Sequence, residues 1–422
     1  MAARTSLDLN AADDAGMAFR SLHRQVSRTV KQKWQADAMR IGFDISQVEA
    51  APGCGYYAEA LACELIRQYA DDRFLLYRSF GEGYWNPDCS KNIPQFSATN
   101  CLQPLILESH EESQTFWGRH FDIDEARCGN PDVIHANNFC CPLVRKARVI
   151  YTVYDLSFID LPECTTEHNR SHCFEGMLMA SLRADMVVAI SHYSRQRFLE
   201  VFPHFPSERA VVAHLGNRLS PEGPAAAPQG MSGIPPFFLS VCTLEPRKNL
   251  RRLLEAYHRY TVGCAQPTPL ILSGGKGWME DGLTEDIARR GLTQWVHVTG
   301  FVSDPELRWL YQHCHAFVYP SLYEGFGLPV LEAMNFGAAV ITSQTTSLPE
   351  VGGAAVLYVD PLDEESMAIA LKSVDQQGCR QALQAKSLQQ ATQFSWTNTA
   401  KTVYAAYEQA LCNPRCTDWS RS

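Results

Sequence analysis

Two acidic residues stand eight positions apart in a glycine-containing stretch that runs from Pro320 to Ala333. The apolar pattern predicts a strand before this stretch and a helix after it, with Pro329 in the first helical turn, where its missing N–H costs nothing. A helix N-terminus offers free N–H groups to a phosphate. Glu324 and Glu332 would repel a phosphate, but carboxylates accept hydrogen bonds from hydroxyls. The spacing therefore indicates sugar and ribose recognition, and a turn acid plus a helix-terminal acid is the structural alternative.

Two adjacent basic residues, Arg247 and Lys248, follow another predicted strand and precede a predicted helix that begins at Asn249. Arginine can pair with phosphate oxygens through two parallel N–H groups, and lysine supplies a point charge. Such a pair at a strand end would balance the charge of a diphosphate. A solvated basic turn is the structural alternative.

Gly53 and Gly55 form a Gly-x-Gly pattern between the first predicted strand and the first predicted helix. The full Gly-x-Gly-x-x-Gly fingerprint and its later ribose-binding acid are missing, which argues against a nicotinamide dehydrogenase. The pattern is informative through its position, because it would face the same cleft as the basic pair.

Strand-like and helix-like runs alternate on both sides of segment 219–236, which is rich in proline, glycine and alanine. The alternation predicts an α/β fold with parallel sheets and crossover helices, and the segment predicts a linker. Loops at the carboxyl ends of the strands would then face a cleft between two domains. The predicted strands are Met39–Ile45, Phe74–Tyr77, Ala147–Val153, Met186–Ile190, Ala210–Ala213, Phe237–Val241, Pro269–Leu272, Val296–Thr299, Ala316–Tyr319 and Ala338–Thr342. The predicted helices are Tyr57–Tyr69, Asn249–Tyr260, Asp304–His313, Leu328–Met334 and Trp396–Leu411.

The 422 residues carry a formal net charge of −9. This acidic balance argues against a nucleic-acid partner, because phosphate backbones require basic surfaces. There is no run of about 18 apolar residues that would predict a membrane span. The 15 cysteines are scattered without zinc-ligand spacing, which predicts free thiols in a reducing compartment. These features favour a cytoplasmic protein.

The first 38 residues mix basic and acidic side chains and lack the apolar core of a signal peptide. This composition predicts a solvated, partly helical extension. A surface helix that touches acidic lipid is the alternative, and it would place the protein peripherally at the cytoplasmic face of the membrane.

The acidic pair with its internal Gly-Phe-Gly-Leu-Pro, preceded by the stretch Leu244–Asn249, resembles the large retaining glycosyltransferase family often called group 1 or family 4. The stretches 273–278, 300–302 and 347–353 fit the same pattern. The resemblance is strongest over 237–360 and looser over 39–218. It implies the GT-B fold, in which two Rossmann-like domains with parallel sheets face a central cleft.

The resemblance and the linker together predict five segments. They are an N-terminal extension (1–38), an acceptor-binding Rossmann-like domain (39–218), a linker (219–236), a nucleotide-sugar-binding Rossmann-like domain (237–395), and a C-terminal helix with a tail (396–422) that crosses back to the first domain.

The donor nucleotide sugar would bind mainly to the second domain. The resemblance implies that Glu324 contacts hydroxyls of the donor sugar and that Glu332 holds the ribose. It implies that Arg247 and Lys248 stabilise the diphosphate leaving group. The other donor-binding residues that it implies are Gly55 from the first domain, the backbone N–H groups of Phe326, Gly327 and Leu328, then Gly274, and Phe301 and Val302 near the base.

The chain departs from the family pattern at Tyr154, where members usually carry a histidine before an aspartate. A tyrosine hydroxyl can hydrogen-bond a sugar, but it cannot shuttle a proton near neutral pH as histidine does. Asp155 keeps the aspartate and is predicted to assist catalysis, with a structural strand-end acid as the alternative. For His135, in the stretch 135–138 near a strand end, a sugar or acceptor contact and a structural role are both open.

Breaking a glycosidic bond to a diphosphate leaves negative charge on the leaving group. Lys248, Arg247 and a helix N-terminus can meet that charge in place of a divalent metal, and no Asp-x-Asp metal motif stands in a convincing position. We therefore expect a metal-independent enzyme without a cofactor, whose donor substrate is a nucleotide-diphosphate sugar. The resemblance implies retention through front-face departure and attack, with the donor phosphate helping to deprotonate the acceptor.

The predicted reaction is transfer of a hexose to a saccharide or lipid-linked oligosaccharide acceptor in polysaccharide biosynthesis. The resemblance, through the Leu244–Asn249 stretch, implies mannose from GDP-mannose. A sugar-nucleotide epimerase on the same fold and a catalytically weak nucleotide-sugar-binding scaffold are the alternatives. The segment at about 80–130 is predicted to form variable loops that face the acceptor, because it is rich in Trp, Tyr, Phe and His (Tyr84, Trp85, Phe116, Trp117 and His120).

Overall fold

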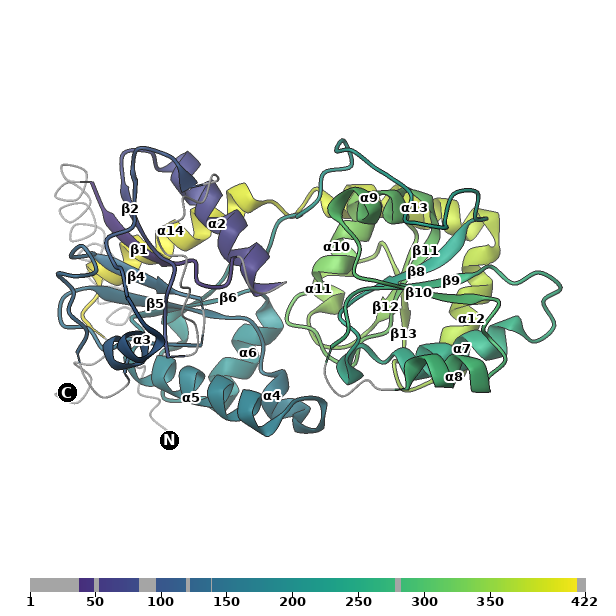
Figure 1. Ribbon diagram of the computed structural model, residues 1–422, viewed down its shortest axis with the longest axis horizontal. Helices are drawn as coiled ribbons and strands as arrows, with labels where there is room; N and C mark the ends of the chain where they lie inside the picture. Colours follow the sequence, from purple (N-terminus) through teal and green to yellow (C-terminus); the bar gives the residue numbers. More distant parts are fainter. Residues whose placement is uncertain are drawn as a thin grey trace, which may run out of the picture.

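Two α/β domains lie side by side in the computed structural model, which describes residues 38–48, 53–82, 96–118, 122–137, 139–277 and 282–415 (Figure 1). The first domain holds a seven-stranded parallel sheet in the order β3-β2-β1-β4-β5-β6-β7. Its strands are β1 (Arg40–Asp44), β2 (Arg73–Tyr77), β3 (Cys101–Leu102), β4 (Val133–Ala136), β5 (Arg148–Val153), β6 (Met186–Ala189) and β7 (Ala210–Val212). The central strands are buried along almost their whole length, as expected of a parallel sheet that helices cover on both faces.

The second domain repeats this architecture with a six-stranded parallel sheet in the order β10-β9-β8-β11-β12-β13. Its strands are β8 (Phe237–Val241), β9 (Leu270–Ser273), β10 (Val296–Gly300), β11 (Cys314–Tyr319), β12 (Val340–Ser343) and β13 (Leu357–Val359). The strand order reverses between β8 and β11, so the loops that follow these two strands meet at one edge of the sheet. Ligands of open parallel sheets bind at this kind of reversal.

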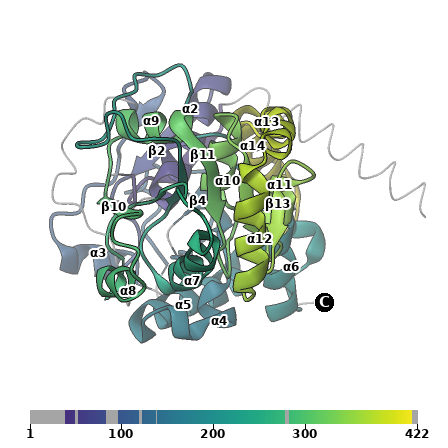
Figure 2. The same ribbon diagram turned by 90° about the vertical axis from the view of Figure 1, so that its right-hand side faces the viewer.

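Helices cover both faces of each sheet. In the first domain they are α2 (Cys54–Gln68), α3 (His110–Phe116), α4 (Ser157–Asp160), α5 (Glu167–Arg183) and α6 (His192–Val201). The remaining helices are α7 (Leu250–Thr261), α8 (Leu283–Arg289), α9 (Asp304–His313), α10 (Leu328–Asn335), α11 (Leu348–Gly352), α12 (Glu364–Asp375), α13 (Gln377–Ala391) and α14 (Trp396–Cys412). Around the second sheet, α9, α10 and α13 lie on one face and α7, α8 and α12 on the other (Figures 1 and 2). Within the described residues, no helix combines the length and apolar character that a membrane crossing requires.

Two segments join the domains. The predicted linker 219–236 contains no helix or strand, and it packs along α9, where the Arg308 side chain donates hydrogen bonds to the carbonyls of Ser220 and Pro224. Helix α14 returns to the first domain and packs against α2 and β5, as the yellow helix in the left-hand domain of Figure 1 shows. The Trp396 indole, at the start of α14, donates to the Asn217 carbonyl at 3.0 Å.

The prediction of an α/β fold with parallel sheets is confirmed. One local prediction is wrong: the first helix begins at Cys54 rather than Tyr57, so Gly55 lies inside α2 and not in a loop before it. The helix starts earlier because Gly53 adopts φ 80°, a left-handed conformation that turns the chain directly into the helix. Ala38 is the only residue of the predicted N-terminal extension (1–38) within the described part of the chain.

Candidate active site

Four charged side chains from two loops of the second domain form one buried cluster. Lys248 Nζ lies 2.7 Å from Glu324 Oε1 and donates to the Tyr319 hydroxyl at 2.9 Å. The Arg247 guanidinium lies 3.0 Å from Glu324 Oε2 and 2.7 Å from Glu245 Oε1. Lys248 and Glu324, predicted from different motifs, are thus in direct contact.

The local structure fixes these two loops against each other. A 3₁₀ turn at Pro246–Lys248 follows β8, and Asn249 then takes a left-handed conformation with φ 62°. The Asn249 side chain donates to the carbonyls of Pro320 and Pro361, so it bridges the basic turn and the loop after β11. The backbone N–H of Leu322 donates to the Arg247 carbonyl at 2.9 Å. Strands β8 and β11 are neighbours in the sheet, which explains why their loops meet.

The cluster is electrostatically balanced in the absence of a ligand. Burial alone would raise the pKa of Glu324, but Lys248 and Arg247 beside it lower the pKa to about 2. The carboxylate is therefore ionised, and two cations face Glu324 and Glu245. A diphosphate that reached these cations would compete with carboxylates for the same N–H groups.

The helix start after this loop offers backbone donors. Gly327 has φ 103° and precedes the first residue of α10, a conformation that favours glycine. Among the described residues, no acceptor takes the N–H groups of Phe326, Gly327 or Leu328. The Phe326 ring itself is 3% exposed and packs against His214 and Phe394, so this residue offers the cleft only its backbone.

Glu332, predicted to hold a ribose, is buried on α10 beside an arginine that the sequence analysis missed. Arg218 Nε lies 2.9 Å from Glu332 Oε1, and the Tyr311 hydroxyl donates to Oε2 at 2.9 Å. Burial raises the pKa of Glu332, an effect that Arg218 and Tyr311 only partly offset. Glu245 was missed as well. The sequence offered one signal for each residue. Arg218 is an isolated basic residue directly before the linker, and Glu245 is an acid two residues before Arg247.

The remaining glycines of the predicted donor site make close contacts within the protein. A side chain at Gly274, where φ is 146°, would collide with the Cys242 carbonyl, and one at Gly55 would collide with the Gln47 carbonyl. A side chain at Gly325 would meet the carbonyl of Tyr154 in the other domain. Internal packing thus already requires glycine at these positions, and contact of Gly55 and Gly274 with a donor stays a prediction.

In the first domain, Asp155 and Tyr154 lie opposite this cluster. Asp155 Oδ1 accepts hydrogen bonds from the N–H and the hydroxyl of Ser157 at 2.9 and 2.7 Å, so it orders the start of α4. The same carboxylate helps to raise the pKa of Arg247, which places the two charges within electrostatic reach. The Tyr154 ring is buried against Tyr57, and a sugar contact through it stays a prediction.

His135 lies in the core of the first domain. It is fully buried; Nδ1 lies 2.6 Å from the Tyr407 hydroxyl on α14, and Nε2 lies 2.8 Å from Thr152 Oγ1. Both ring nitrogens therefore have partners inside the protein. The structural alternative fits this geometry, whereas a sugar or acceptor contact through this side chain does not.

Some of the residues predicted to contact the base or the acceptor are exposed, and others are buried. Phe301 is 78% exposed in the loop after β10, with Val302 partly buried beside it, so the Phe301 ring is open to a base. Trp117 is 1% exposed and its indole donates to the Ser79 carbonyl, so this side chain is not available to an acceptor. Phe116 packs under Arg127. The other predicted acceptor residues, Tyr84, Trp85 and His120, lie outside the described residues.

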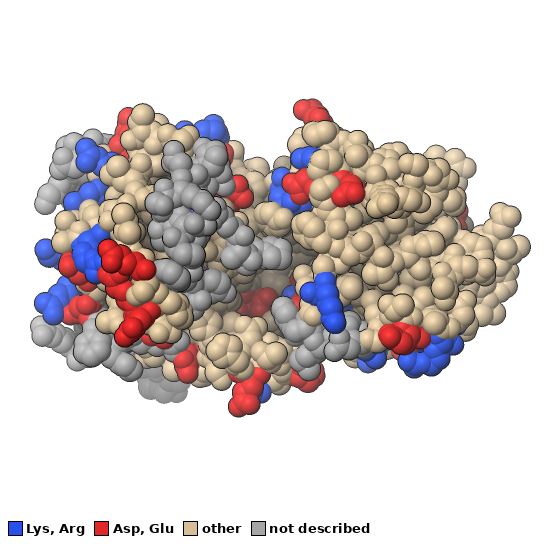
Figure 3. All heavy atoms as spheres, viewed as in Figure 1, with Lys and Arg blue, Asp and Glu red and all other residues tan. Residues whose placement is uncertain are grey.

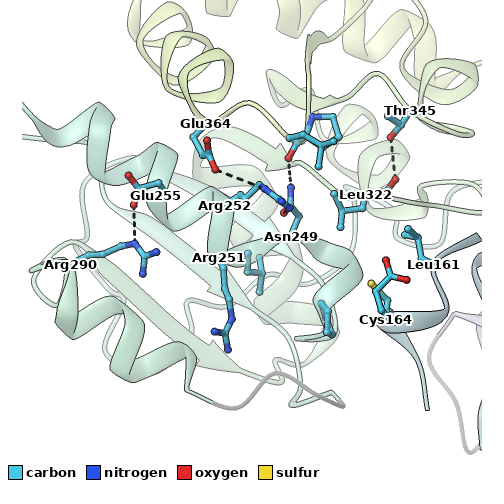
Figure 4. Close-up of a pocket in the computed structure, with 15 residues that line it drawn as sticks. Leu161, Cys164, Asn249, Arg251, Arg252, Glu255, Arg290, Leu322, Thr345 and Glu364 are labelled. Carbon is cyan, nitrogen blue, oxygen red and sulfur yellow. Dashed lines mark hydrogen bonds and ion pairs between the residues drawn. The ribbon is translucent and has the colours of Figure 1, made fainter. Parts of the chain in front are cut away.

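A pocket of about 830 Å³ lies beside the charged cluster and is lined by both domains. Leu161, Glu163 and Cys164 line it from the first domain, and Pro246 and Asn249 line it from the basic turn. Figure 4 shows this pocket with arginine–glutamate pairs of the second domain along one wall, and Figure 3 shows the hollow between the domains. The pocket adjoins the turn that carries the cations, but neither Lys248 nor Glu324 lines it.

One group of side chains at the domain interface has the composition of a metal site. Ligand atoms of His192, His214 and Glu350 lie within 4.8 Å of one another. However, the Glu350 oxygens already accept the backbone N–H groups of His192 and Tyr193 at the start of α6, and His214 Nε2 lies 3.1 Å away. The group is therefore a contact between the domains, since Glu350 of α11 caps a helix of the first domain.

Solved structures of other proteins share this two-domain arrangement. The sucrose-phosphate synthase of Thermosynechococcus elongatus superposes with a TM-score of 0.65 at 18% identity, covering 88% of this chain and 98% of that one. Anabaena HepE in complex with UDP and glucose superposes with a TM-score of 0.64 at 17% identity, covering 88% and 100%. These structures confirm the predicted GT-B fold.

The sequence comparisons give the family. Residues 227–399 match the family described as glycosyl transferases group 1. O-antigen chain mannosyltransferase B of Escherichia coli is 37% identical over 324 residues, which cover 72% of this chain and 81% of the relative. The chain belongs to the group 1 glycosyltransferases. It is a glycosyltransferase, with a nucleotide-sugar donor and a saccharide acceptor.

Proposed function

We propose that this glycosyltransferase transfers mannose from GDP-mannose to a saccharide or lipid-linked oligosaccharide during surface polysaccharide assembly, with retention and without a metal or another cofactor. The observation that carries the proposal is the contact of Lys248 with Glu324 at 2.7 Å. This contact brings a phosphate-binding cation and a hydroxyl-binding acid to one place, as a nucleotide-diphosphate sugar requires.

The charges of the cluster support leaving-group stabilisation without a metal. Arg247 and Lys248 would exchange part of their contacts with Glu245 and Glu324 for oxygens of the diphosphate. The N–H groups at the start of α10 would add donors in the same place, where the helix dipole favours an anion. Preorganised donors of this kind stabilise charge as it develops in the transition state.

The bond changes balance without a protein nucleophile. The bond between the sugar C1 and the diphosphate oxygen breaks, and the acceptor oxygen forms its bond to C1 on the same face. The acceptor proton passes to the departing phosphate oxygen, which leaves GDP and the glycosylated acceptor. Asp155, half-buried near Arg247, would tune the field at the diphosphate, and Tyr154 would contribute no proton transfer near neutral pH.

The choice of mannose and of the acceptor is supported by the relatives. The relative that is 37% identical is named O-antigen chain mannosyltransferase B, which indicates mannose transfer to an O-antigen chain by that protein. The pocket lined by Leu161 and Glu163 lies next to the basic turn and is open to both domains, so it can admit the acceptor. A cytoplasmic location and peripheral contact with the membrane belong to the same proposal, because lipid-linked acceptors reside at that surface.

A panel of nucleotide sugars tests the proposal. Thermal unfolding and donor hydrolysis would be measured with GDP-mannose, GDP-glucose, UDP-glucose and UDP-N-acetylglucosamine, followed by transfer to a mannose oligosaccharide. We expect GDP-mannose to give the largest stabilisation, about 2.7 kcal/mol at a hundredfold excess over its Kd, and an α-linked product by NMR.

Three results would overturn parts of this proposal. A UDP sugar that stabilises the protein and is transferred, while GDP-mannose is not, would refute the donor assignment. A β-linked product would refute retention. Epimerised nucleotide sugar formed without an acceptor would show that transfer is not the reaction. Glu324→Gln is the variant to compare with the wild type in the same panel, because the substitution keeps the size of the side chain and removes its charge.

A further inference from the structure

Arg218 is the residue that holds the carboxylate of Glu332. We propose that Arg218 is a positioning residue of the ribose subsite, which holds the Glu332 carboxylate oriented toward the two ribose hydroxyls of the nucleotide. The inference rests on the proposed function, in which Glu332 binds the ribose.

Three contacts fix the Arg218 side chain, which is 12% exposed. Its Nε lies 2.9 Å from Glu332 Oε1, and its Nη1 lies 2.7 Å from Asp304 Oδ1. Its guanidinium carbon lies 4.4 Å from the centre of the Tyr56 ring. A planar guanidinium held on two edges and one face has little freedom, so it fixes the carboxylate beside it.

The contacts of Glu332 leave it able to accept more hydrogen bonds. Oε1 accepts from Arg218 and Oε2 from Tyr311, so each oxygen keeps one lone pair. Two neighbouring oxygens with one free lone pair each match the two adjacent hydroxyls of a ribose. Without Arg218, the carboxylate would lose the hydrogen bond that sets the direction of Oε1.

Arg218 also controls the charge of Glu332. Burial raises the pKa of Glu332, Arg218 and Tyr311 lower it, and Asp304 raises it further. These three are the side chains whose charge or hydrogen bonds shift the pKa of Glu332. Loss of Arg218 removes the one cation among them, so Glu332 would take up a proton at a higher pH and become a poorer acceptor.

The position of Arg218 connects the ribose subsite to the first domain. Arg218 lies between β7 and the linker, and it stacks on Tyr56, whose neighbour Gly55 belongs to the first turn of α2. Glu332 and Asp304 belong to α10 and α9 of the second domain. The arginine therefore holds a second-domain acid from the segment that joins the domains.

The test compares GDP with 2′,3′-dideoxy-GDP in calorimetric binding to the whole protein. The wild type is expected to bind GDP at least about tenfold more tightly, because the ribose hydroxyls donate to a charged acceptor. Arg218→Gln is expected to reduce that ratio to about threefold or less, and Arg218→Lys to an intermediate value. If Arg218→Gln fails to fold, Arg218→Lys carries the test.

Controls separate the failure of this inference from failure of the proposed function. Glu332→Gln should lose the preference for GDP; if the wild type has no preference, the ribose role of Glu332 fails and the inference with it. If Glu332→Gln behaves as expected but Arg218→Gln keeps the full ratio, only the inference on Arg218 is overturned. Arg308→Gln removes an arginine that contacts the linker 219–236 but not Glu332, and this variant should keep the wild-type ratio of the two affinities.

A pH profile gives a readout that a purely structural role would not move. The affinity of the wild type for GDP should fall at acid pH as Glu332 is protonated, and in Arg218→Gln this fall should begin at a higher pH. The affinity for 2′,3′-dideoxy-GDP should show no such displacement. Equal displacement for both nucleotides would mean that Arg218 does not act through the ribose hydroxyls.

Discussion

The two sides of the interdomain cleft carry their polar residues in different ways. On the second-domain side, Lys248 and Glu324 are buried and paired across two loops. In the first domain, Asp155 beside the cleft and His135 in the core make their hydrogen bonds within that domain, with Ser157 and Thr152. The second domain therefore holds a buried ion pair beside the cleft, whereas these two polar residues of the first domain make hydrogen bonds that stabilise the local structure of that domain.

The difference follows from the cost of burying charge. A buried ion pair such as Lys248–Glu324 is weak support for stability, since well-packed apolar residues of similar size are often as good or better. The pair is therefore explained by the chemistry of the site rather than by folding. His135 shows the opposite case, because a neutral histidine between two hydroxyl groups satisfies buried partners without any charge.

Lys248→Ala should have the largest effect. We expect kcat to fall about 10²–10³-fold, because removal of one preorganised donor at a developing negative charge typically costs that much. Steady-state transfer at saturating donor measures it. Lys386→Ala, which removes an exposed lysine on α13, is the matched control and should transfer at the wild-type rate.

A double variant separates catalysis from stability in this cluster. Breaking a buried pair from one side destabilises a protein by about 3–5 kcal/mol, so Lys248→Met alone should lower the Tm. Lys248→Met combined with Glu324→Gln should recover the Tm but not the activity. Recovery of both would mean that the pair serves folding, and the contrast between the two domains would not hold.

Asp155→Asn should have a smaller effect. Asparagine can still accept the hydrogen bonds of Ser157, so the Tm should stay at the wild-type value, and kcat should fall less than about tenfold. Asp155→Ala should lower the stability by about 0.5–2 kcal/mol, because Ser157 loses the acceptor of its N–H and its hydroxyl. A fall in kcat of a hundredfold or more for Asp155→Asn would place this residue among the catalytic groups instead.

The sequence predicted the fold where apolar runs were long. Strands such as β5 and β8 are buried on both faces and therefore read as continuous apolar segments. The two-residue β3 and the three-residue β13 were missed, because so few residues carry no periodicity. The four-residue β4 and the helices α3, α4, α5, α6, α8, α11 and α12 were not predicted either. Helix α13 was missed because three buried positions out of fifteen leave little amphipathic signal.

The sequence predicted the charged cluster because its members follow neighbouring strands. The contact of Lys248 with Glu324 needs only the pairing of β8 with β11. The sequence could not predict the contact of Arg218 with Glu332, because the two residues are 114 positions apart. Their contact depends on the path of the chain between the two domains. The sequence could not decide the role of His135, because the partner Tyr407 lies 272 positions away on the helix that crosses back.

His135→Gln should change stability and its pH dependence but not catalysis. Burial lowers the pKa of His135 to about 3. Between that value and about 6.5, the unfolded chain binds the additional proton, so wild-type stability falls as the pH is lowered through this window. At about pH 5 this single group accounts for about 2 kcal/mol.

Urea unfolding of both proteins at about pH 7.5 and about pH 5 checks this prediction. His135→Gln should be less stable by about 1–3 kcal/mol near neutral pH, because buried hydroxyls lose a partner. The difference should narrow at the lower pH. A constant difference would contradict the lowered pKa of His135. A kcat reduced as strongly as in Lys248→Ala would show that His135 has a role in the cleft.

Removal of divalent metal should have the smallest effect, since Arg247 and Lys248 already supply the positive charge at the proposed diphosphate position. Transfer rates should be equal before and after dialysis against EDTA, and added Mg²⁺ or Mn²⁺ should change neither kcat nor KM. Activity that is lost in EDTA and restored by Mn²⁺ would contradict this prediction. In that case, the variant His214→Ala locates the metal. If Mn²⁺ does not restore the activity of this variant, the metal binds at the interdomain group of His192, His214 and Glu350. If Mn²⁺ does restore it, Arg247 and Lys248 are not sufficient to stabilise the leaving group.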